Sequence, residues 1–199
     1  MSQLAPRSRR GSGEETRAGL LAAARRIGSK SPFSRITVEQ LTDAAGTSRA
    51  TFYLYFKNKD EIYLELARET CDLLYEAAGH TSRGHEPREA IELATRGYVD
   101  VFMANADVMR LLYPVARADD RFGSLLSTVR SRFHERIERG LERGIADGVF
   151  RPLDAPLVAR ALGGMVENFC VRQIFHQEPL DDEECVRVLS DLWYHAVAR

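Results

Sequence analysis

Short polar and cationic side chains gather between residues 47 and 59, in a pattern that suits contact with nucleic acid. Hydroxyl and guanidinium groups at the start of a helix suit base edges, and flanking lysines suit phosphates. Arg49, Thr51 and Tyr53 are the expected contacts to bases and the nearby backbone. Thr37, Tyr55 and Lys59 are the expected contacts to phosphates. The full candidate set is Thr37, Thr47, Ser48, Arg49, Ala50, Thr51, Tyr53, Tyr55, Lys57 and Lys59.

Two short helices joined by a glycine turn are predicted to position these side chains. Thr37 caps the first helix, with Gln40 three residues later in a capping-box arrangement. Gly46 supplies a residue that adopts positive φ without a Cβ penalty, and Thr47 or Ser48 then caps a second helix over residues 48–54. This order of elements predicts a helix-turn-helix whose second helix enters a major groove.

The run A-G-T-S-R-A-T-F-Y-L-Y-F-K-N-K, residues 45–59, resembles the DNA-binding signature of TetR-type bacterial transcriptional regulators. Upstream, the i, i+3, i+4, i+7 series Leu20, Ala23, Ala24 and Ile27 is similar to the first helix of that family. The resemblance covers roughly residues 14–66. The residue types depart from the family pattern at Gly28, Thr42, Thr47 and residues 31–33. These departures bear on local packing and turn geometry.

The resemblance implies an all-α protein with an N-terminal three-helix DNA-binding domain and a C-terminal helical domain. In the family the second domain binds small inducers, and its last two helices form a four-helix dimer interface. It therefore implies a homodimeric regulator, most simply a repressor, released from a palindromic operator when a small, largely apolar ligand moves the fourth helix.

Charge is distributed unevenly along the 199 residues. Residues 1–59 contain eleven Lys and Arg against four Asp and Glu, a net charge of +7, so the remainder carries −8 in a chain whose total is −1. A basic N-terminal part with an acidic C-terminal part fits a nucleic-acid-binding head on a body that must not bind nucleic acid.

Composition excludes several other classes of protein. An apolar fraction of 44% without a run of about 18 apolar residues indicates a globular chain with no membrane span. No apolar segment follows the N-terminal arginines, so we expect a cytoplasmic protein. Cys71, Cys170 and Cys185 lack the spacing of a zinc site or a disulfide framework, so we expect reduced thiols, no metal and no cofactor.

The expected organisation is a basic arm at residues 1–12, a DNA-binding domain at 13–60 and a helical domain at 61–199. The arm is flexible and polar, either simply solvated or reaching along phosphates. Hydrophobic periodicity and capping residues predict about nine helices in all. Besides those of the helix-turn-helix, they span about 13–29, 58–78, 87–105, 107–115, 119–147, 157–175 and 181–196, with a loop at 79–86. Asn58, Asp154 and Asp181 are the expected N-terminal caps of three of these helices.

The second domain contains aromatic and flexible side chains on helices expected to face one another, which is typical of a ligand pocket. The same pattern also describes an ordinary core. The pocket candidates are Phe102, Met103, Met109, Leu112, Tyr113, Phe122, Phe133, Met165, Asn168, Phe169 and Arg172, with Gln173 and Phe175 as further possibilities. The charged side of residues 119–147 is expected to face solvent.

The last two helices are apolar over more of their circumference than one buried face requires. Gly163 and Gly164 lie in the first of them, where each costs about 1 kcal/mol of helix propensity, so close approach of another backbone is an expected compensation. The candidate dimer-interface residues are Leu157, Ala161, Gly164, Val186, Leu189 and Trp193.

Catalytic patterns do not stand out. His134 and Glu135 lack the second histidine of the H-E-x-x-H zinc pattern, and no nucleophile elbow or glycine-rich phosphate loop occurs. The leading hypothesis is therefore a ligand-responsive DNA-binding regulator rather than an enzyme. The alternatives are a helical protein-binding scaffold with incidental DNA affinity and an enzyme with a helical pocket.

Overall fold

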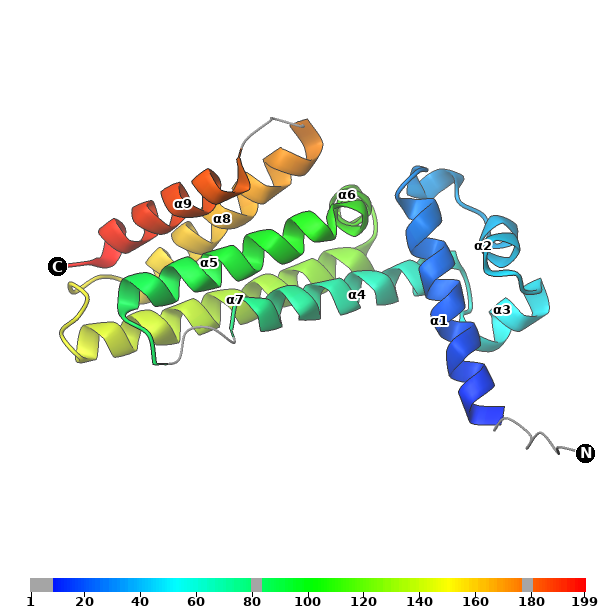
Figure 1. Ribbon diagram of the computed structural model, residues 1–199, viewed down its shortest axis with the longest axis horizontal. Helices are drawn as coiled ribbons and strands as arrows, with labels where there is room; N and C mark the ends of the chain where they lie inside the picture. The colour runs from blue at the N-terminus through cyan, green and yellow to red at the C-terminus, as the bar shows by residue number, and fades with distance from the viewer. Residues whose placement is uncertain (1–8, 80–83, 177–180) are drawn as a thin grey trace, which may run out of the picture. The chain divides into compact units, whose positions relative to one another are not determined.

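The computed structural model describes residues 9–79, 84–176 and 181–199. Within these ranges the chain forms nine α-helices and one short 3-10 helix, η1, and its only β pairing is an isolated bridge between Phe150 and Ala198. The prediction of an all-α fold with about nine helices is confirmed. The contacts divide the chain into two compact units, Met1–Ala67 and Arg68–Arg199 (Figure 1).

The first unit contains α1 (Arg9–Gly28), η1 (Phe33–Arg35), α2 (Val38–Ala45), α3 (Arg49–Tyr55) and the start of α4 (Lys59–Ala77). α1 begins at Arg9, so residues 9–12 of the predicted arm are helical, and residues 1–8 lie outside the described residues. Leu20, Leu41, Phe52 and Ile62 are all fully buried in this unit. Each of the four main helices therefore contributes a large apolar side chain to one core.

Local sequence signals determine where these helices start and stop. Thr37 and Gln40 form the predicted capping box, and Gly46 ends α2 in the left-handed conformation at φ 64°. The Ser48 hydroxyl accepts from the Thr51 amide at 3.1 Å and so caps α3. The predicted cap at Asn58 is also present, since its side-chain oxygen accepts from the Glu61 amide at 3.0 Å.

Among the side chains of this unit that the structure describes, two polar ones are buried, and both form hydrogen bonds. The Tyr63 hydroxyl donates to the Ala24 carbonyl oxygen at 2.7 Å and links α4 to α1, and burial raises the Tyr63 pKa. Thr42 is 2% exposed, and its hydroxyl donates to the Glu39 carbonyl oxygen at 2.9 Å, so this buried hydroxyl is satisfied.

The second unit continues from α4 into α5 (Pro87–Ala104), α6 (Ala106–Val115), α7 (Asp120–Ala146), α8 (Ala155–His176) and α9 (Asp182–Val197). α8 packs along α7, and α9 packs along α5 (Figure 1). Asp154 and Asp181 cap α8 and α9 as predicted, through the amides of Leu157 and Glu184. Gly148, with φ 72°, follows the end of α7.

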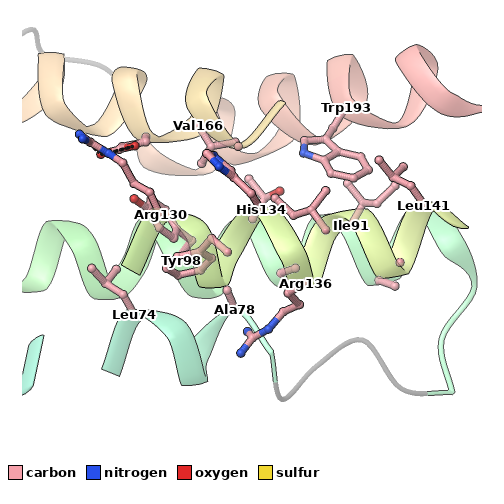
Figure 2. A pocket seen from close by; sticks show the side chains of 18 of the residues that line it. Leu74, Ala78, Ile91, Tyr98, Arg130, His134, Arg136, Leu141, Val166 and Trp193 are labelled. Atoms are coloured by element: carbon pink, nitrogen blue, oxygen red, sulfur yellow. Dashed lines mark hydrogen bonds and ion pairs between the residues drawn. The ribbon is translucent and has the colours of Figure 1, made fainter. Parts of the chain in front are cut away.

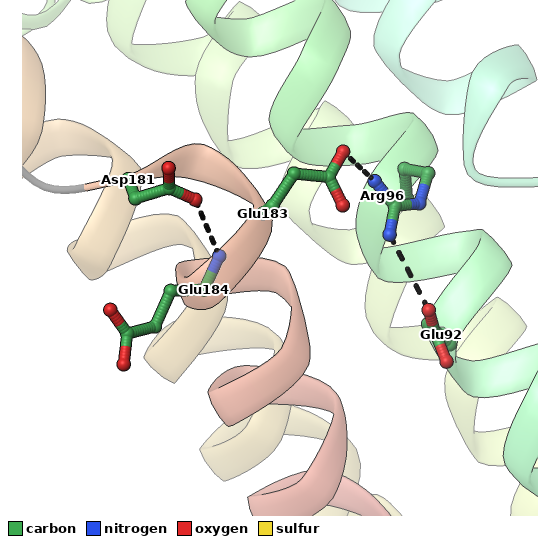
Figure 3. A network of polar contacts seen from close by, with 5 residues as sticks. All are labelled: Glu92, Arg96, Asp181, Glu183 and Glu184. Atoms are coloured by element: carbon green, nitrogen blue, oxygen red, sulfur yellow. Dashed lines mark hydrogen bonds and ion pairs between the residues drawn. The ribbon is translucent and has the colours of Figure 1, made fainter.

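Ion pairs add to the apolar contact between α5 and α9. Arg96 on α5 reaches the Glu183 carboxylate at 2.5 Å and the Glu92 carboxylate at 3.4 Å (Figure 3). Arg88 pairs with Asp191 further along the same two helices. These pairs are solvent-exposed, so they fix the register of the two helices more than they stabilise the fold.

Candidate functional sites

The first candidate site is the exposed surface of α3. Arg49 and Ala50 are exposed at its start, and Tyr53 and Leu54 are 50% and 79% exposed. The Ser48 and Thr51 hydroxyls lie 2.9 Å apart in one hydrogen bond, which orients both at the N-terminus of the helix. Large apolar side chains on a short solvent-facing helix indicate a contact surface, because burial would otherwise be favoured.

Leu54 is a second exposed apolar residue of α3, and it was not among the contacts predicted from the sequence. Phe52 is fully buried and separates the exposed Tyr53 and Leu54 from the interior. The sequence signal was the i, i+4 relation between Ala50 and Leu54, which places both on the outward side once Phe52 is assigned to the core. A leucine side chain there is suited to contact with a thymine methyl group.

The lysines and hydroxyls around α3 fall into two groups. Lys57 is exposed, whereas Thr47 and Tyr55 are half-buried. The Lys59 ammonium donates to the Phe33 and Ile36 carbonyl oxygens at 2.9 and 3.0 Å and lies 4.6 Å from the Phe33 ring centroid. Two of its three donors are thus used inside the unit, which indicates a structural role for Lys59. Its contact to phosphate stays a prediction.

Thr37 is likewise engaged within its own helix. Its hydroxyl accepts from the Gln40 amide at 3.2 Å. That bond uses one lone pair and leaves the hydroxyl proton available, so the cap is compatible with the predicted phosphate contact.

The second candidate site is a cavity of about 420 Å³ in the second unit. Its walls come from α4, α5, α6, α7, α8 and α9, and most lining side chains are aliphatic or aromatic. Tyr98, Ile91, His134, Val166 and Trp193 converge on this space in Figure 2. A volume in this range and a mainly apolar lining are typical of small-molecule sites.

Only part of the predicted pocket lines this cavity. Phe102, Met109, Tyr113 and Phe133 are lining residues, as predicted. Leu112 and Phe122 are 0% exposed and belong to the core instead, and Met165 packs against the apolar cluster around Leu141 and Phe150. Met103, Asn168, Phe169, Arg172, Gln173 and Phe175 are not among the lining residues.

The sequence interpretation missed several polar lining residues. Tyr113 donates to Glu167 at 2.6 Å, and Arg130 donates to both Glu167 oxygens at 2.9 and 3.0 Å. Burial, followed by the Glu167 carboxylate, raises the pKa of Tyr113, and the hydrogen bond to Glu167 raises that of Arg130. His134 also faces the cavity, and burial lowers its pKa. No sequence pattern marked Glu167, which lies between Val166 and Asn168 on α8.

The charged side of α7 is not simply solvated, which corrects the expectation from its sequence. Arg132 pairs with Asp72 on α4 at 2.8 Å, and Arg136 donates to the Tyr75 carbonyl oxygen. The guanidinium carbons of Arg132 and Arg136 lie 4.1 and 3.3 Å from the Tyr75 ring centroid. Cation–π contacts of this kind attach α4 to α7.

The predicted dimer-interface residues also divide into two groups. Leu157 is 61% exposed, Ala161 is exposed and Gly164 is half-buried on α8. Val186 and Leu189 are 1% and 4% exposed, so they belong to the core of the subunit rather than to its surface. Trp193 lines the cavity. The exposed apolar side chains of α9 are instead Val188 and Leu192, at 41% and 54%.

Other features of the described residues bear on chemistry. The three cysteines are buried free thiols, and burial raises the pKa of Cys71 to about 12, which makes it a poor nucleophile. Among the described residues, no group of His, Cys, Asp and Glu could hold a metal ion, and no helix is long and apolar enough to cross a membrane.

A capped helix-turn-helix with an exposed second helix, joined to a helical unit with an apolar cavity, defines a DNA-binding regulator. The chain matches the family model for bacterial regulatory proteins of the tetR family over residues 20–66. It matches the model for the tetracyclin repressor-like C-terminal domain over residues 84–171. The two matches together cover more than half of the chain, which therefore belongs to the TetR family.

Individual relatives support the same assignment. The transcriptional regulator EthR of Mycolicibacterium smegmatis is 43% identical over 60 residues, which are 30% of this chain and only 28% of EthR. The solved TetR-family regulator PfmR of Thermus thermophilus is 25% identical with a TM-score of 0.73, covering 87% of this chain and 96% of PfmR. These relatives are regulators, so the chain is a DNA-binding transcriptional regulator rather than an enzyme.

A third similarity concerns the fold alone. A regulator from Saccharomonospora viridis, solved in complex with choline, is 18% identical with a TM-score of 0.78, and the match covers 94% of this chain and 99% of that one.

Proposed function

We propose that this protein is a homodimeric, cytoplasmic repressor that leaves a palindromic operator when a small, largely apolar ligand enters the cavity. The observation that carries the proposal is that α4 contributes both to the core of the first unit and to the cavity wall of the second. Ile62 and Tyr63 are buried in the first unit, whereas Leu74 lines the cavity.

DNA recognition is assigned to α3. In a dimer, two copies of α3 would enter successive major grooves about 34–36 Å apart, which requires a palindromic site. Arg49 and Thr51 are proposed to read bases, and Lys57 to contact phosphate. The exposure of Arg49 and Lys57 and the fixed orientation of the Thr51 hydroxyl support these roles.

Dimerisation is assigned to the exposed apolar residues of α8 and α9. Leu157 and Leu192 are each more than half exposed, and Ala161 and Val188 are also exposed. Apolar residues repeated on the outer side of two neighbouring helices are suited to pack against a second copy of the same pair.

Ligand response requires the cavity and α4 to influence each other. Phe133 lines the cavity, and its ring meets Tyr75 of α4 edge-on at 5.4 Å and Tyr98 edge-on at 5.3 Å. A ligand that displaces Phe133 therefore disturbs the contacts that attach α4 to α7. The ligand shifts the equilibrium between two positions of α4, and the size of the shift is set by the difference in ligand affinity between them. The choline complex of the Saccharomonospora viridis regulator supports the expectation that this fold accepts a small molecule.

The test is a mobility-shift assay of the purified protein on DNA flanking its own gene, with excess unrelated competitor DNA. We expect a selective complex of two subunits per site whose affinity falls steeply with salt. Arg49→Ala should weaken selective binding, and Arg139→Ala, at an exposed arginine of α7, serves as the matched control.

Two outcomes would contradict the proposal. Binding that does not prefer any sequence, after a selection from random DNA, would favour a protein-binding scaffold with incidental DNA affinity. A monomer on the operator would contradict the role of α8 and α9.

A further inference from the structure

The charged side chains that line the cavity are paired, held by a neighbouring side chain or exposed to solvent. Arg136 contacts the carbonyl oxygen and the ring of Tyr75, and Arg143 and Asp147 are exposed. Glu167, whose side chain is 16% exposed, pairs with Arg130 at 2.7 Å and also accepts from Tyr113. All three residues line the cavity. A charged ligand would find no unpaired counter-charge in this cluster, and burying a charge without a partner is costly.

Uncharged polar groups of the cavity, in contrast, are available. The His134 imidazole, the Tyr98 hydroxyl and the Trp193 indole N–H form no hydrogen bond within the part of the chain that the structure describes. Figure 2 shows these three side chains around the same space, with Ile91 and Val166 beside them. A neutral imidazole offers one donor and one acceptor, so His134 can accommodate either kind of ligand group.

Gly163 creates the space in which His134 lies. A Cβ added at Gly163 would be 3.3 Å from Cδ2 of His134 and 3.2 Å from Cδ1 of Ile137. Both distances are tighter than ordinary van der Waals contact. Gly163 thus permits the imidazole of His134 on α7 to approach the α8 backbone. This close approach explains why a glycine, which lowers helix propensity, lies in the middle of α8.

We propose that the cavity selects an uncharged, largely aromatic ligand, and that His134 recognises its one hydrogen-bonding group. This inference rests on the proposed function, because it specifies the ligand of the same regulator. Aromatic walls from Tyr98, Phe102 and Phe133 favour edge and stacked contacts with ligand rings. A volume of about 420 Å³ accommodates a molecule of two fused rings with short substituents.

The first experiment varies ligand charge on one ring system. N-phenyl-1-naphthylamine, an uncharged dye whose emission rises in apolar surroundings, is bound to the full-length protein. It is then displaced by 2-acetylnaphthalene, by 2-naphthoate or by 2-naphthyltrimethylammonium. We expect the ketone to displace the dye at a concentration at least about tenfold lower than either ion, since neither ion gains a buried and unpaired counter-charge. Equal or tighter binding of either ion would overturn the proposal.

The second experiment tests the role of His134. The protein should bind 2-acetylnaphthalene about fivefold more tightly than 2-ethylnaphthalene, because only the ketone accepts a hydrogen bond. His134→Phe should abolish this ratio, and His134→Gln should restore part of it. A ratio unchanged in His134→Phe would overturn the assignment, and the thermal midpoint of each variant shows whether it is folded.

The outcomes separate this inference from the proposed function. A protein that shifts its operator DNA but binds no uncharged naphthalene would overturn the ligand class alone. A protein that binds the ketone through His134 but no DNA would overturn the proposed function alone.

Discussion

The two neighbouring glycines of α8 provide a sharp test, because one adjoins the cavity and the other does not. A Cβ at Gly163 would come within 3.2 Å of Ile137 and 3.3 Å of His134, whereas a Cβ at Gly164 would meet nothing within 4 Å in the subunit. Each replacement by alanine gains about 1 kcal/mol of helix propensity. At Gly163 this gain is offset by overpacking, which typically costs about 1–3 kcal/mol.

The expected results therefore differ in sign. Gly164→Ala should raise the stability of the isolated subunit by about 1 kcal/mol, a rise of roughly 2–4 °C in Tm for a chain of this size. Gly163→Ala should leave Tm unchanged or lower it, and should weaken binding of N-phenyl-1-naphthylamine by about fivefold as the imidazole is displaced.

Three measurements test this pair of variants: thermal unfolding by circular dichroism, dye titration and sedimentation velocity. If Gly164 lies in the proposed dimer interface, Gly164→Ala changes the monomer–dimer equilibrium while dye affinity stays constant. Equal losses of dye affinity in both variants would refute the reasoning, because only Gly163 has cavity side chains within reach of a new methyl group.

Three further predictions follow from particular contacts. Lys59→Ala should lower the free energy of unfolding in urea by about 1–2 kcal/mol, because the two carbonyl contacts of the ammonium are lost. Lys57 is exposed, so Lys57→Ala should lower only the affinity for DNA. The reverse pattern would assign the phosphate contact to Lys59. Tyr75→Leu should keep operator binding but should raise the ligand concentration that releases half of the protein from its operator. An unchanged concentration would show that the contact between α4 and α7 does not contribute to the ligand response. Burial lowers the His134 pKa; the Glu167 carboxylate opposes this effect, and Arg160 and Arg130 add to it. The unfolded chain therefore takes up this proton first as pH falls below about 6.5. Stability should therefore fall more from pH 7.5 to 5.5 in the unmodified protein than in His134→Phe, and identical losses would contradict the burial of a neutral imidazole.

Local signals allowed most helix boundaries to be predicted from the sequence. Thr37, Ser48, Asn58, Asp154 and Asp181 all form the caps that their spacing suggested, because a cap depends on residues within one turn. The start of α1 was missed because glycine, serine and arginine at residues 9–13 carry no apolar periodicity.

The cavity could not be predicted in the same way. α8 is apolar around most of its circumference, so periodicity did not show which of its faces meets α7. As a result the residue types of Met165, Phe169 and Arg172 suggested a pocket lining, whereas Gly163, Val166 and Glu167 are the α8 residues that line the cavity. Likewise, Val186 and Leu189 are buried by contact with other helices. The spacing of residues within α9 does not show which helices those are.

The composition of α3 bears on how the protein finds its site among many competitors. In Arg49–Tyr55 only Arg49 is charged, and Ala50, Tyr53 and Leu54 present methyl, ring and isobutyl groups to solvent. Attraction to any stretch of DNA is mainly ionic. It weakens with added salt, because the release of condensed counterions into a more concentrated solution is less favourable. Apolar contact with thymine methyl groups does not depend on counterion release. The ratio of operator affinity to random-DNA affinity should therefore increase with ionic strength. High salt then weakens binding to both kinds of DNA but increases the sequence selectivity of the protein.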